Sequence, residues 1–336
     1  MKALEIQGEG GIDTLAMVDR PSPEPGPGQI KVKVHANSLN YRDLNTVRFP
    51  ARMGLAYPRV PNSDGAGEVV AVGDGVAAFK PGDRVAGCFF DDWDAGGVSP
   101  AAMASARGGP IDGMAAEEVV LGERGAVAIP EHLSYEEAAT LPCAALTAWH
   151  ALVVKGGLTA GETVLLLGTG GVSIFALQFA AMMGARAIVT SKSDEKLERA
   201  KAMGAWATVN YEATPDWAKE VAALTQGRGV DHVVEVGGGG TLEASIEAVR
   251  VGGHIALIGV LTMGTINPMP ILRKSIRLNG IYVGSRDWFQ AMNAAIAANA
   301  LKPVIDKVFP FADAPAAYKH MESAQHFGKI VVKMEG

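Results

Sequence analysis

The sequence predicts an α/β protein in which a doubly wound parallel sheet is joined to a second, β-rich domain. From about residue 160 onward, short apolar strands alternate with helical segments, the pattern of a parallel sheet covered by helices. The residues before this point form short alternating runs between Pro and Gly, which is typical of antiparallel β structure. The length of 336 residues accommodates two domains of the usual ~100–200 residues.

The β-rich part carries clear strand and turn signals. Residues 30–34 read IKVKV, the alternation expected of a half-buried strand. Pro and Gly cluster at 21–29, and the PGD of 81–83 favours a turn because Pro fixes φ and Gly accepts a positive φ. Residues 91–114 show no period and many small residues. We expect a long loop there, either a lid or a solvated insertion.

The parallel sheet is predicted to begin with an apolar strand at 163–167, followed by an apolar helix at 172–183. A second strand at 187–190 leads into an amphipathic helix at 194–203, which ends before Gly204. Further elements are expected at 207–210, 217–225, 231–236, 241–250, 254–259, near 287–300 and at 329–333.

Composition and charge exclude several classes of function. A net charge of −6 and a pI of about 5.7 leave no basic surface for nucleic acid. Two cysteines, Cys88 and Cys143, cannot form a disulfide framework or a four-thiolate zinc site. No apolar signal segment follows Lys2, so a cytoplasmic location is expected. Residues 163–185 are uncharged over a membrane-spanning length, but glycines interrupt them, which favours a strand, a turn and a buried helix.

Glycine is unusually frequent, at 41 of 336 residues or about 12% against a usual ~7%, and one group marks a nucleotide site. The segment GTGGVS at 168–173 lies between a predicted strand and a predicted helix. In a dinucleotide-binding loop the first Gly permits the turn and the second lets the backbone approach the pyrophosphate. The helix N-terminus then offers free N–H groups to the phosphates. Ser173 replaces the usual third Gly, and its small side chain still allows close packing.

The end of the second strand predicts NADPH rather than NADH. An NAD site places an acid about 20 residues after the glycines, where it accepts from the ribose 2′-hydroxyl and repels a 2′-phosphate. This chain has TSKS at 190–193 instead. Hydroxyls with a cation, Ser191 and Lys192, favour the phosphate through charge-assisted hydrogen bonds. The alternative is that Lys192 is an ordinary solvated lysine, and Asp194 and Glu195 are read as acids of the first helical turn.

Ligands of open α/β sheets bind at the carboxyl ends of the strands. Three later strand ends are expected at 236–237, 258–260 and 283–284, and each carries a glycine. A glycine there allows the backbone to approach a nicotinamide closely.

Several segments together resemble the medium-chain dehydrogenase/reductase superfamily over nearly the whole chain. They are PNSDGAGEVVAVGDGV (61–76), KPGDRV (80–85), LPCAALTAWHAL (141–152), GTGGVS (168–173) and HFGKIVVK (326–333). The resemblance implies a GroES-like catalytic domain, built from both chain ends, around a Rossmann domain, with the active site between them. The expected domains are 1–134 (GroES-like), 135–284 (Rossmann, NADP(H)-binding) and 285–336 (return to the catalytic domain).

The resemblance also bears on zinc. The zinc-dependent alcohol dehydrogenases of this superfamily hold the catalytic metal with Cys, His and Cys. By motif, those positions fall at Asn40, Ser63 and Cys143 in this chain. A catalytic site needs about three protein ligands, so we expect no catalytic zinc. The 91–114 segment contains no cysteine, so a four-cysteine structural zinc site is not expected either. Without the metal, the chain looks like the zinc-independent quinone oxidoreductase group, which reduces quinones and α,β-unsaturated carbonyls with NADPH.

In such a site, hydrogen-bond donors must stabilise the negative charge that develops on the acceptor oxygen. Tyr41 and Asn40 are the candidate catalytic residues by position, although Tyr41 has the alternative of packing the cleft wall. Asp43 is a third candidate catalytic residue, which would orient the neighbouring chain, and its alternative is a structural role. Thr147 resembles a cofactor contact, and Cys143 is expected to be a packing thiol. Asp64 stands where the family carries an acid near the nicotinamide.

The strand ends and the resemblance together give the expected cofactor contacts. They are Asn40, Thr147, Gly168, Thr169, Gly170, Gly171, Val172, Ser191, Lys192, Lys196, Tyr211, Val236, Gly237, Ile258, Gly259, Val260, Val283, Gly284 and Lys329.

Reduction of a quinone or enone by NADPH is the first functional hypothesis, because an enone needs only donors on its carbonyl oxygen. Carbonyl/alcohol interconversion without zinc is the second, since it requires a base that the motifs do not supply. A third hypothesis is an NADPH-binding sensor or structural protein without turnover. The expected partner is a small-molecule substrate, not nucleic acid or a membrane, and similar proteins often form homodimers.

Overall fold

The computed structural model describes residues 1–259 and 261–334. By its contacts the chain divides into two units, 1–146 with 283–336 and 147–282. Residues 135–146, which the sequence places in the dinucleotide-binding domain, belong to the first unit. One reason is that the Tyr135 ring stacks on His35, with ring centroids 4.4 Å apart.

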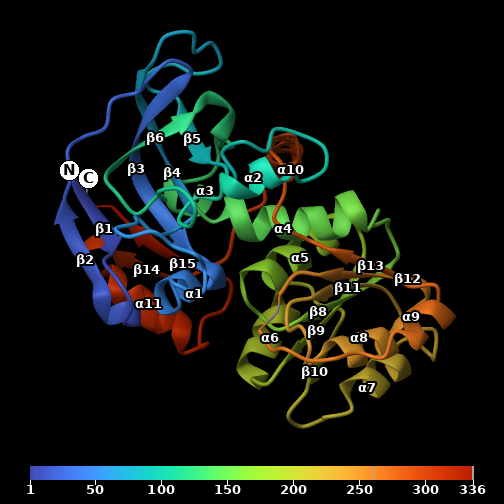
Figure 1. Ribbon diagram of the computed structural model, residues 1–336. Coiled ribbons are helices and arrows are strands. Elements are labelled where there is room, and N and C mark those ends of the chain that lie inside the picture. Colours follow the sequence, from blue (N-terminus) through green and yellow to red (C-terminus); the bar gives the residue numbers. More distant parts are fainter. Residues whose placement is uncertain (260, 335–336) are drawn as a thin grey trace. The chain divides into compact units, whose positions relative to one another are not determined.

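The first unit is built on a seven-stranded sheet with the order β14-β15-β3-β4-β5-β7, in which β6 also pairs with β3 (Figure 1). A separate antiparallel pair joins β1 and β2. Its strands are β1 (Lys2–Ile6), β2 (Leu15–Asp19), β3 (Gln29–Leu39), β4 (Asp64–Val72), β5 (Arg84–Gly87), β6 (Glu118–Gly122), β7 (Ala126–Ala128), β14 (Ile305–Pro310) and β15 (Lys329–Lys333). Its helices are α1 (Tyr41–Arg48), α2 (Pro100–Ala104), α3 (Tyr135–Ala138), α10 (Arg286–Ala298) and α11 (Ala314–Glu322). Short 3₁₀ turns are η1 (Gly11–Thr14), η2 (Glu123–Gly125) and η5 (Phe311–Asp313).

The core of this unit forms where the alternating apolar residues of β3 meet those of the flanking elements. Ile30, Val32 and Val34 are buried and pack with Val69 of β4 and Ile330 of β15. The alternation predicted for 30–34 is therefore confirmed, because every second side chain of a strand points to the same face.

The second unit is a six-stranded sheet with the order β10-β9-β8-β11-β12-β13, and every neighbouring pair is parallel. Figure 1 shows this sheet between α5 on one side and α7 and α8 on the other. The predicted doubly wound parallel sheet is confirmed. Its strands are β8 (Thr163–Leu167), β9 (Arg186–Ser191), β10 (Ala207–Asn210), β11 (Val230–Glu235), β12 (Val249–Leu257) and β13 (Arg277–Gly280). Its helices are α5 (Gly171–Met182), α6 (Asp194–Ala202), α7 (Trp217–Leu224), α8 (Leu242–Ala248) and α9 (Met269–Arg273).

Two predictions about individual elements were wrong in detail. The expected loop at 91–114 contains α2, which begins because Ser99 accepts a hydrogen bond from the Ala102 N–H at 3.1 Å and Pro100 starts the helix. The helix expected over 241–250 ends at Ala248, since Val249 already pairs with Val230 of β11.

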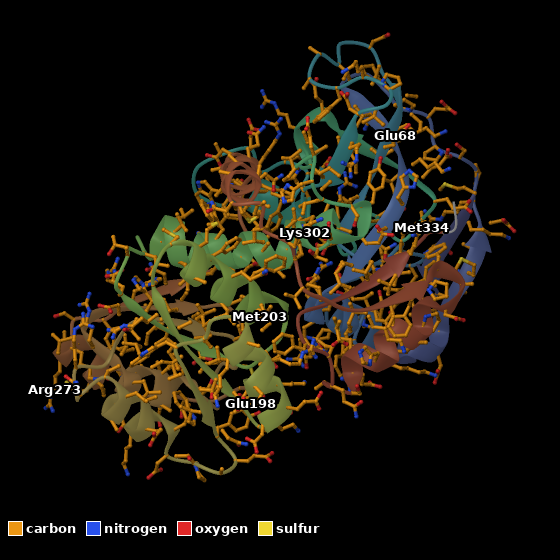
Figure 2. The ribbon with its side chains drawn as sticks, turned by 180° about the vertical axis from the view of Figure 1, so that it is seen from behind. Glu68, Glu198, Met203, Arg273, Lys302 and Met334 are labelled. Carbon is orange, nitrogen blue, oxygen red and sulfur yellow. The ribbon has the colours of Figure 1, made fainter. Side chains whose placement is uncertain are left out.

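The segment 163–185 forms β8, the glycine turn and α5, as predicted. Among the described residues, no helix is both long enough and apolar enough to cross a membrane. Figure 2 shows Glu198 of α6 and Arg273 of α9 on the outside of the second unit, so these two helices present charged side chains to solvent.

Candidate functional site

The glycine turn of the second unit has the geometry of an open backbone loop. Gly168, directly after β8, has φ +71°, a conformation that a side chain disfavours. Gly170 is the N-cap of α5, and no side chain caps this helix. A Cβ placed on Gly168 or Gly170 would meet no atom within 4 Å. The space beside these two glycines and the lack of a side-chain cap on α5 fit the approach of a phosphate to the start of this helix.

Ser173 does more than leave room for packing. Its buried hydroxyl donates to the Leu167 carbonyl at 2.6 Å and so ties the end of β8 to the first turn of α5. Thr169 is also buried within the turn. The loop is thus fixed from inside while its glycines stay open.

The end of β9 brings together three of the residues predicted for the adenosine end of the cofactor. Ser191 is buried, and its hydroxyl accepts from the Ser193 N–H at 3.2 Å. Lys192 is exposed, and its ammonium forms no ion pair within the part of the chain that the structure describes. The N–H of half-exposed Tyr211 donates to the Ser191 carbonyl at 3.2 Å, which places Tyr211 beside the same strand end.

The first turn of α6 is capped locally. Ser193 accepts from the Lys196 N–H at 3.3 Å, and Asp194 accepts from the Asn210 amide at 2.7 Å. Asp194 is therefore used inside the unit, as expected for an acid of the first turn.

At the end of β11, sequence analysis missed a buried carboxylate that organises the loop. Glu235 is fully buried and accepts from the N–H groups of Gly237 at 2.8 Å and Gly238 at 3.0 Å. It also accepts from the hydroxyls of Thr241, at 2.6 Å, and Ser245. An acid ending an apolar strand just before four glycines was the available signal. Its hydrogen bonds hold the loop that contains Val236 and Gly237.

Three of the predicted glycine contacts have an internal packing reason. A Cβ on Gly259 would lie 1.9 Å from the Val236 carbonyl oxygen, and one on Gly237 would lie 2.4 Å from the Thr241 hydroxyl. In the first unit, a Cβ on Gly284 would lie 2.8 Å from the Leu146 side chain. These glycines are required by the fold itself, whatever they bind.

The remaining residues of these strand ends lie as follows. Ile258 is half-buried after β12, and Val283, buried in the first unit, has φ +50°. Val260 lies outside the described residues. Thr147 is buried in α4 (Leu146–Trp149), which stands between the π-helical turns η3 (Leu141–Ala145) and η4 (His150–Lys155). Such π-turns are rare and frequent near functional sites.

In the first unit, three adjacent strands bring polar side chains to one edge of the sheet. β15 runs antiparallel to β3 with Ile330 opposite Leu39, and β4 pairs with β3 with Asp64 opposite Ser38. Lys329, Asn40 and Asp64 therefore meet at the end of β3. We call these three residues, with Ser63 and Cys143, the polar cluster.

Lys329 is buried in the polar cluster. Its ammonium donates to the Leu39 carbonyl and to Asn40 Oδ1, both at 2.6 Å. Burial lowers the pKa of Lys329, although the nearby Asp64 carboxylate opposes this effect. Sequence analysis assigned Lys329 to the cofactor, and the structure gives two of its three N–H groups to the first unit.

The other members of the cluster are linked in a row. Asn40 Nδ2 donates to the Ser63 hydroxyl at 3.3 Å, and that hydroxyl donates to Asp64 Oδ1 at 2.7 Å. Asp64 Oδ2 accepts from the Cys143 N–H at 3.0 Å. Burial raises the pKa of Asp64 to about 6, and the positive charge of Lys329 limits the rise.

The thiol of Cys143 is held in its neutral form. Burial, and then the negative charge of Asp64, raises the pKa of the Cys143 thiol. Its backbone N–H, not its sulfur, contacts the cluster through Asp64. These contacts agree with a packing thiol.

Asp43 is fully buried, and its carboxylate accepts hydrogen bonds from neighbouring residues of the first unit. It accepts from the Asn40 N–H at 2.8 Å, from the Ser63 N–H at 3.2 Å and from the Arg42 guanidinium at 3.2 Å. It therefore fixes the start of α1 to the loop before β4. This favours the orienting role of Asp43 over contact with a substrate.

Tyr41 begins α1, and 46% of its surface is exposed. Its hydroxyl forms no hydrogen bond to any residue the structure describes.

A second polar network, which sequence analysis did not find, lies next to the cluster and is centred on Asn62. Asn62, with φ +64°, donates to Asn37 Oδ1 at 2.7 Å and accepts from the buried Tyr318 hydroxyl. Asn37 in turn donates to the Met334 sulfur at 3.5 Å, and Met334 is labelled in Figure 2. Because Asn62 precedes Ser63, this network fixes the backbone of the cluster.

The residues present do not fit a zinc ion. Among residues 1–259 and 261–334, no group of three or more His, Cys, Asp or Glu side chains is placed to hold a metal. At the three motif positions stand an amide, a hydroxyl and a neutral thiol, and a lysine ammonium contacts the amide. A cation already bonded at Asn40 opposes a second cation at the same place.

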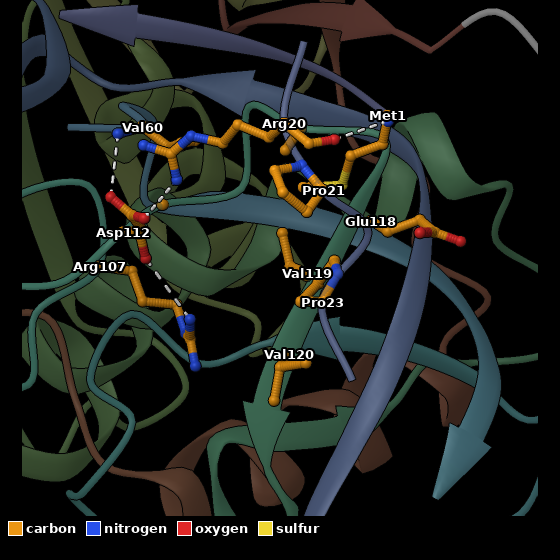
Figure 3. Close-up of a pocket in the computed structure, with 12 residues that line it drawn as sticks. Met1, Arg20, Pro21, Pro23, Val60, Arg107, Asp112, Glu118, Val119 and Val120 are labelled. Atoms are coloured by element: carbon orange, nitrogen blue, oxygen red, sulfur yellow. Dashed lines mark hydrogen bonds and ion pairs between the residues drawn. The ribbon is translucent and has the colours of Figure 1, made fainter. Parts of the chain in front are cut away.

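The first unit also has a hollow of about 490 Å³ beside β6 (Figure 3), and no residue of the polar cluster lines it. The charged side chains that line it form ion pairs, among them Arg107 with Asp91 and Glu118 with Lys31. Asp112 accepts from Arg20 at 2.7 Å, from Arg59 at 3.1 Å and from the Val60 N–H at 3.0 Å. None of the predicted site residues lines the hollow, and its ion pairs join segments that are distant in the sequence.

Two family models match the chain. The model described as alcohol dehydrogenase GroES-like domain matches residues 26–131, and the model described as zinc-binding dehydrogenase matches residues 171–298.

Curated relatives match along nearly the whole chain. A zinc-type alcohol dehydrogenase-like protein of Schizosaccharomyces pombe is 44% identical over 338 residues, covering 96% of this chain and 98% of that protein. A quinone oxidoreductase of Rattus norvegicus is 27% identical over 343 residues, covering 99% and 97%.

Solved structures agree with the fold. A putative alcohol dehydrogenase from Sinorhizobium meliloti superposes with a TM-score of 0.92 at 43% identity, covering 98% of both chains. An NAD-dependent alcohol dehydrogenase gives 0.91 at 36% identity over 100% of both chains. A mycobacterial protein complexed with NADPH gives 0.83 at 28% identity over 99% of both chains.

Proposed function

The chain belongs to the medium-chain dehydrogenase/reductase superfamily and is an oxidoreductase of that family, and from this premise we propose that it transfers hydride from NADPH to a quinone or an α,β-unsaturated carbonyl without a catalytic metal. The fold class predicted from the sequence, a Rossmann sheet with a GroES-like domain, is confirmed by the same matches.

The second unit fits a dinucleotide. The open glycine turn of Gly168 and Gly170 and the uncapped start of α5 would hold the pyrophosphate, because N–H groups and the helix dipole favour negative charge. Bound NADPH supplies a hydride from C4 of its nicotinamide. The loop ordered by Glu235 and the glycine contact between Gly259 and Val236 support the strand ends on which a nicotinamide is expected.

The preference for NADPH rests on the end of β9. The solved structures of similar proteins include both an NAD-dependent enzyme and an NADPH complex, so the residues of this chain must decide. No acid stands at the end of β9, and the Lys192 ammonium is exposed and bonded to no described carboxylate. We propose that Lys192 and Ser191 bind the 2′-phosphate, with Tyr211 beside them.

The polar cluster supports metal-free chemistry. Asn40 and Ser63 stand at two of the three zinc-ligand positions, and their side chains are bonded to Lys329 and Asp64. This arrangement is the single observation that carries the proposal, because it supplies hydrogen-bond donors where a zinc enzyme supplies a Lewis acid.

In the proposed reaction, the β-carbon of the enone accepts the hydride and forms a new C–H bond. The electrons of the C=C bond shift toward the carbonyl oxygen, which becomes negatively charged, and a solvent proton then adds to the α-carbon. We propose that Tyr41 and Asn40 donate hydrogen bonds toward this oxygen, and that Asp43 positions Asn40.

Interconversion of alcohols and carbonyls is the second candidate, favoured by the alcohol dehydrogenase names of the relatives in Schizosaccharomyces pombe and Sinorhizobium meliloti. Oxidation of an alcohol needs a base for the hydroxyl proton. In the described polar cluster no imidazole is present, so a quinone or enone remains the first choice.

The test is NADPH consumption, followed at 340 nm, with matched panels of quinones, enones, aldehydes and ketones. The proposal expects the highest kcat/KM among quinones or enones. A preference for aldehydes would favour the second candidate. Tight NADPH binding by fluorescence without turnover of any acceptor would contradict both and favour a sensor or structural role.

A further inference from the structure

Lys329 is the one ammonium of the polar cluster, and its surroundings separate it from every carboxylate nearby. It is 3% exposed and bonds to the Leu39 carbonyl and to Asn40 Oδ1, both neutral groups. Within the described part of the chain it forms no direct ion pair. Its charge is therefore not cancelled at close range, unlike that of the typical paired lysine.

The carboxylate that balances this charge lies at the far end of a hydrogen-bonded row. Lys329 donates to Asn40, Asn40 donates to Ser63, and Ser63 donates to Asp64. Every donor in the row points from the cation toward the anion. Such a row polarises each of its members in the same direction.

The orientation of Asn40 in this row follows from chemistry. An ammonium can only donate, so the atom of Asn40 that faces Lys329 must be its oxygen, and its NH₂ must face Ser63. Ser63 and Asn40 thus hold Lys329 and Asp64 apart while joining them. The third N–H of Lys329 has no partner among the described residues.

We infer that Lys329 is a catalytic residue of this site: its remaining N–H and its uncancelled charge stabilise the negative charge that develops on the acceptor oxygen. This inference rests on the proposed function and adds to it a residue that stands in for the metal charge. Asp64, separated from Lys329 by the side chains of Asn40 and Ser63, keeps Lys329 protonated without neutralising it. A preorganised cation in a buried site is more effective than the same cation in water.

Arg42, the other cation beside the cluster, does not fit this role. Its guanidinium is bonded to the Arg107 carbonyl at 2.7 Å and to Asp43, and it lies over the Phe89 ring, 5.0 Å from the centroid. These contacts commit Arg42 to the packing of α1. Lys329 is left as the cation of the site.

The test compares the single variant Lys329→Met with the double variant Lys329→Met/Asp64→Asn, which removes both the positive and the negative charge. Lys333→Met is the matched control, because Lys333 lies on the same strand but is exposed and paired with Glu136. For each protein, kcat and KM are measured with the best acceptor, NADPH affinity by fluorescence and the unfolding temperature by calorimetry. The whole chain is used throughout.

We expect Lys329→Met to lower kcat about 100-fold, the usual cost of removing one donor to a developing oxyanion, with NADPH affinity little changed. The single variant should also unfold at a lower temperature, because Asp64 is left unbalanced. The double variant should regain the unfolding temperature of the unmodified protein but not its kcat. Lys333→Met should match the unmodified protein in both.

Three results would overturn the inference. Turnover of Lys329→Met near the unmodified level is the first. The second is recovery of both stability and kcat in the double variant, because this would mean that Lys329 and Asp64 balance each other only for stability. A weakened NADPH affinity with kcat preserved at saturating NADPH is the third, and it would assign Lys329 to the cofactor. Lack of turnover by the unmodified protein with every acceptor would overturn the proposed function and this inference together, whereas the three results above leave the proposed function standing.

Discussion

The glycine turn of the second unit and the polar cluster of the first unit solve opposite problems. The turn leaves the start of α5 without a side-chain cap and keeps space open around Gly168 and Gly170. The cluster buries side chains and satisfies them with one another, from Lys329 to Asp64. The comparison teaches that a site for a large anion can be made by omitting side chains, so that the backbone is accessible. A site that stabilises developing charge instead needs several side chains held in place by hydrogen bonds.

The two units also differ in how they treat buried titratable groups. In the first unit, Lys329 and Asp64 balance each other through Asn40 and Ser63. In the second unit, His254 is fully buried beside His232, with their Nδ1 atoms 3.4 Å apart, and no carboxylate among the described residues bonds to His254. Burial, and then the charge of His232, lowers the pKa of His254 to about 4.

The largest expected effect is a loss of stability in acid, caused by protonation of the buried His254. Because the pKa of His254 is lowered from 6.5 to about 4, its contribution to stability is complete above pH 6.5. That contribution is lost as the pH falls from 6.5 through 4, since the unfolded state then binds the proton more readily. The loss approaches about 3 kcal/mol, at 1.36 kcal/mol for each pH unit. The measurement is the free energy of unfolding of the protein and of His254→Leu between pH 4 and pH 8.

The stability gap between the two proteins should narrow on acidification. The Leu variant should lose less stability than the unmodified protein, because its side chain cannot titrate. Parallel pH profiles for the two proteins would show that His254 is not the group that limits stability in acid.

The second effect concerns the open space of the glycine turn. Gly170 has φ −77° and ψ −177°, a backbone that any residue adopts, and an added Cβ meets nothing. Gly170→Ala should therefore leave the unfolding temperature unchanged. It should weaken NADPH about 100-fold, the upper end of the 1–3 kcal/mol cost of overpacking, because the methyl group occupies the place of the pyrophosphate.

Gly168→Ala is the matched control, and titration calorimetry with NADPH is the measurement. Its φ of +71° strains an alanine, so this variant should lose stability even without cofactor. Unchanged NADPH affinity in Gly170→Ala would mean that the space at the turn is not where the phosphates bind.

Much of the fold could be predicted from the sequence, because the alternation of apolar strands and helices is local. The strand 163–167 and the glycine turn follow from adjacent residues. The start of β12 could not be predicted, since Val249 pairs with a strand almost 20 residues earlier. Short α2 was hidden because its Ser-Pro cap lies within a stretch of small residues.

The candidate site was predicted unevenly for the same reason. Ser191 and Lys192 lie at a strand end that the periodicity marks, and Asn40 and Ser63 lie in motifs. Lys329 meets Asn40 across 289 positions of the chain, so only the pairing of β15 with β3 reveals the contact. The separation of Lys329 from Asp64 depends on the side chains of Asn40 and Ser63 between them, and no local sequence pattern predicts this arrangement.

The third effect tests the cofactor preference at the end of β9. Lys192→Ala should weaken NADPH about 30-fold, within the 1.5–3 kcal/mol of a charged hydrogen bond, and leave NADH affinity nearly unchanged. Lys201→Ala is the control, because Lys201 belongs to α6 but is paired with Glu198 at 2.6 Å. Equal weakening of NADPH and NADH by Lys192→Ala would refute the assignment of the 2′-phosphate.

The fourth effect separates an exposed donor from a buried one. Tyr41 is exposed and its hydroxyl has no described partner, so Tyr41→Phe removes one neutral hydrogen bond at most. We expect kcat to fall about fivefold, near the 1 kcal/mol of such a bond, with KM and the unfolding temperature unchanged. Steady-state kinetics with the best quinone or enone gives the measurement. An unchanged kcat would remove Tyr41 from the catalytic residues and leave the task to the polar cluster.

The smallest expected effect is that of metal removal, and it bears most directly on the cluster. If Asn40, Ser63 and neutral Cys143 cannot hold zinc, metal analysis should find far less than one zinc per chain. Treatment with a chelator should leave both turnover and the unfolding temperature unchanged, because no step and no part of the fold depends on a bound metal. One tightly bound zinc per chain, with turnover lost on chelation and restored by zinc, would show that the charge of Lys329 does not replace a metal in this protein.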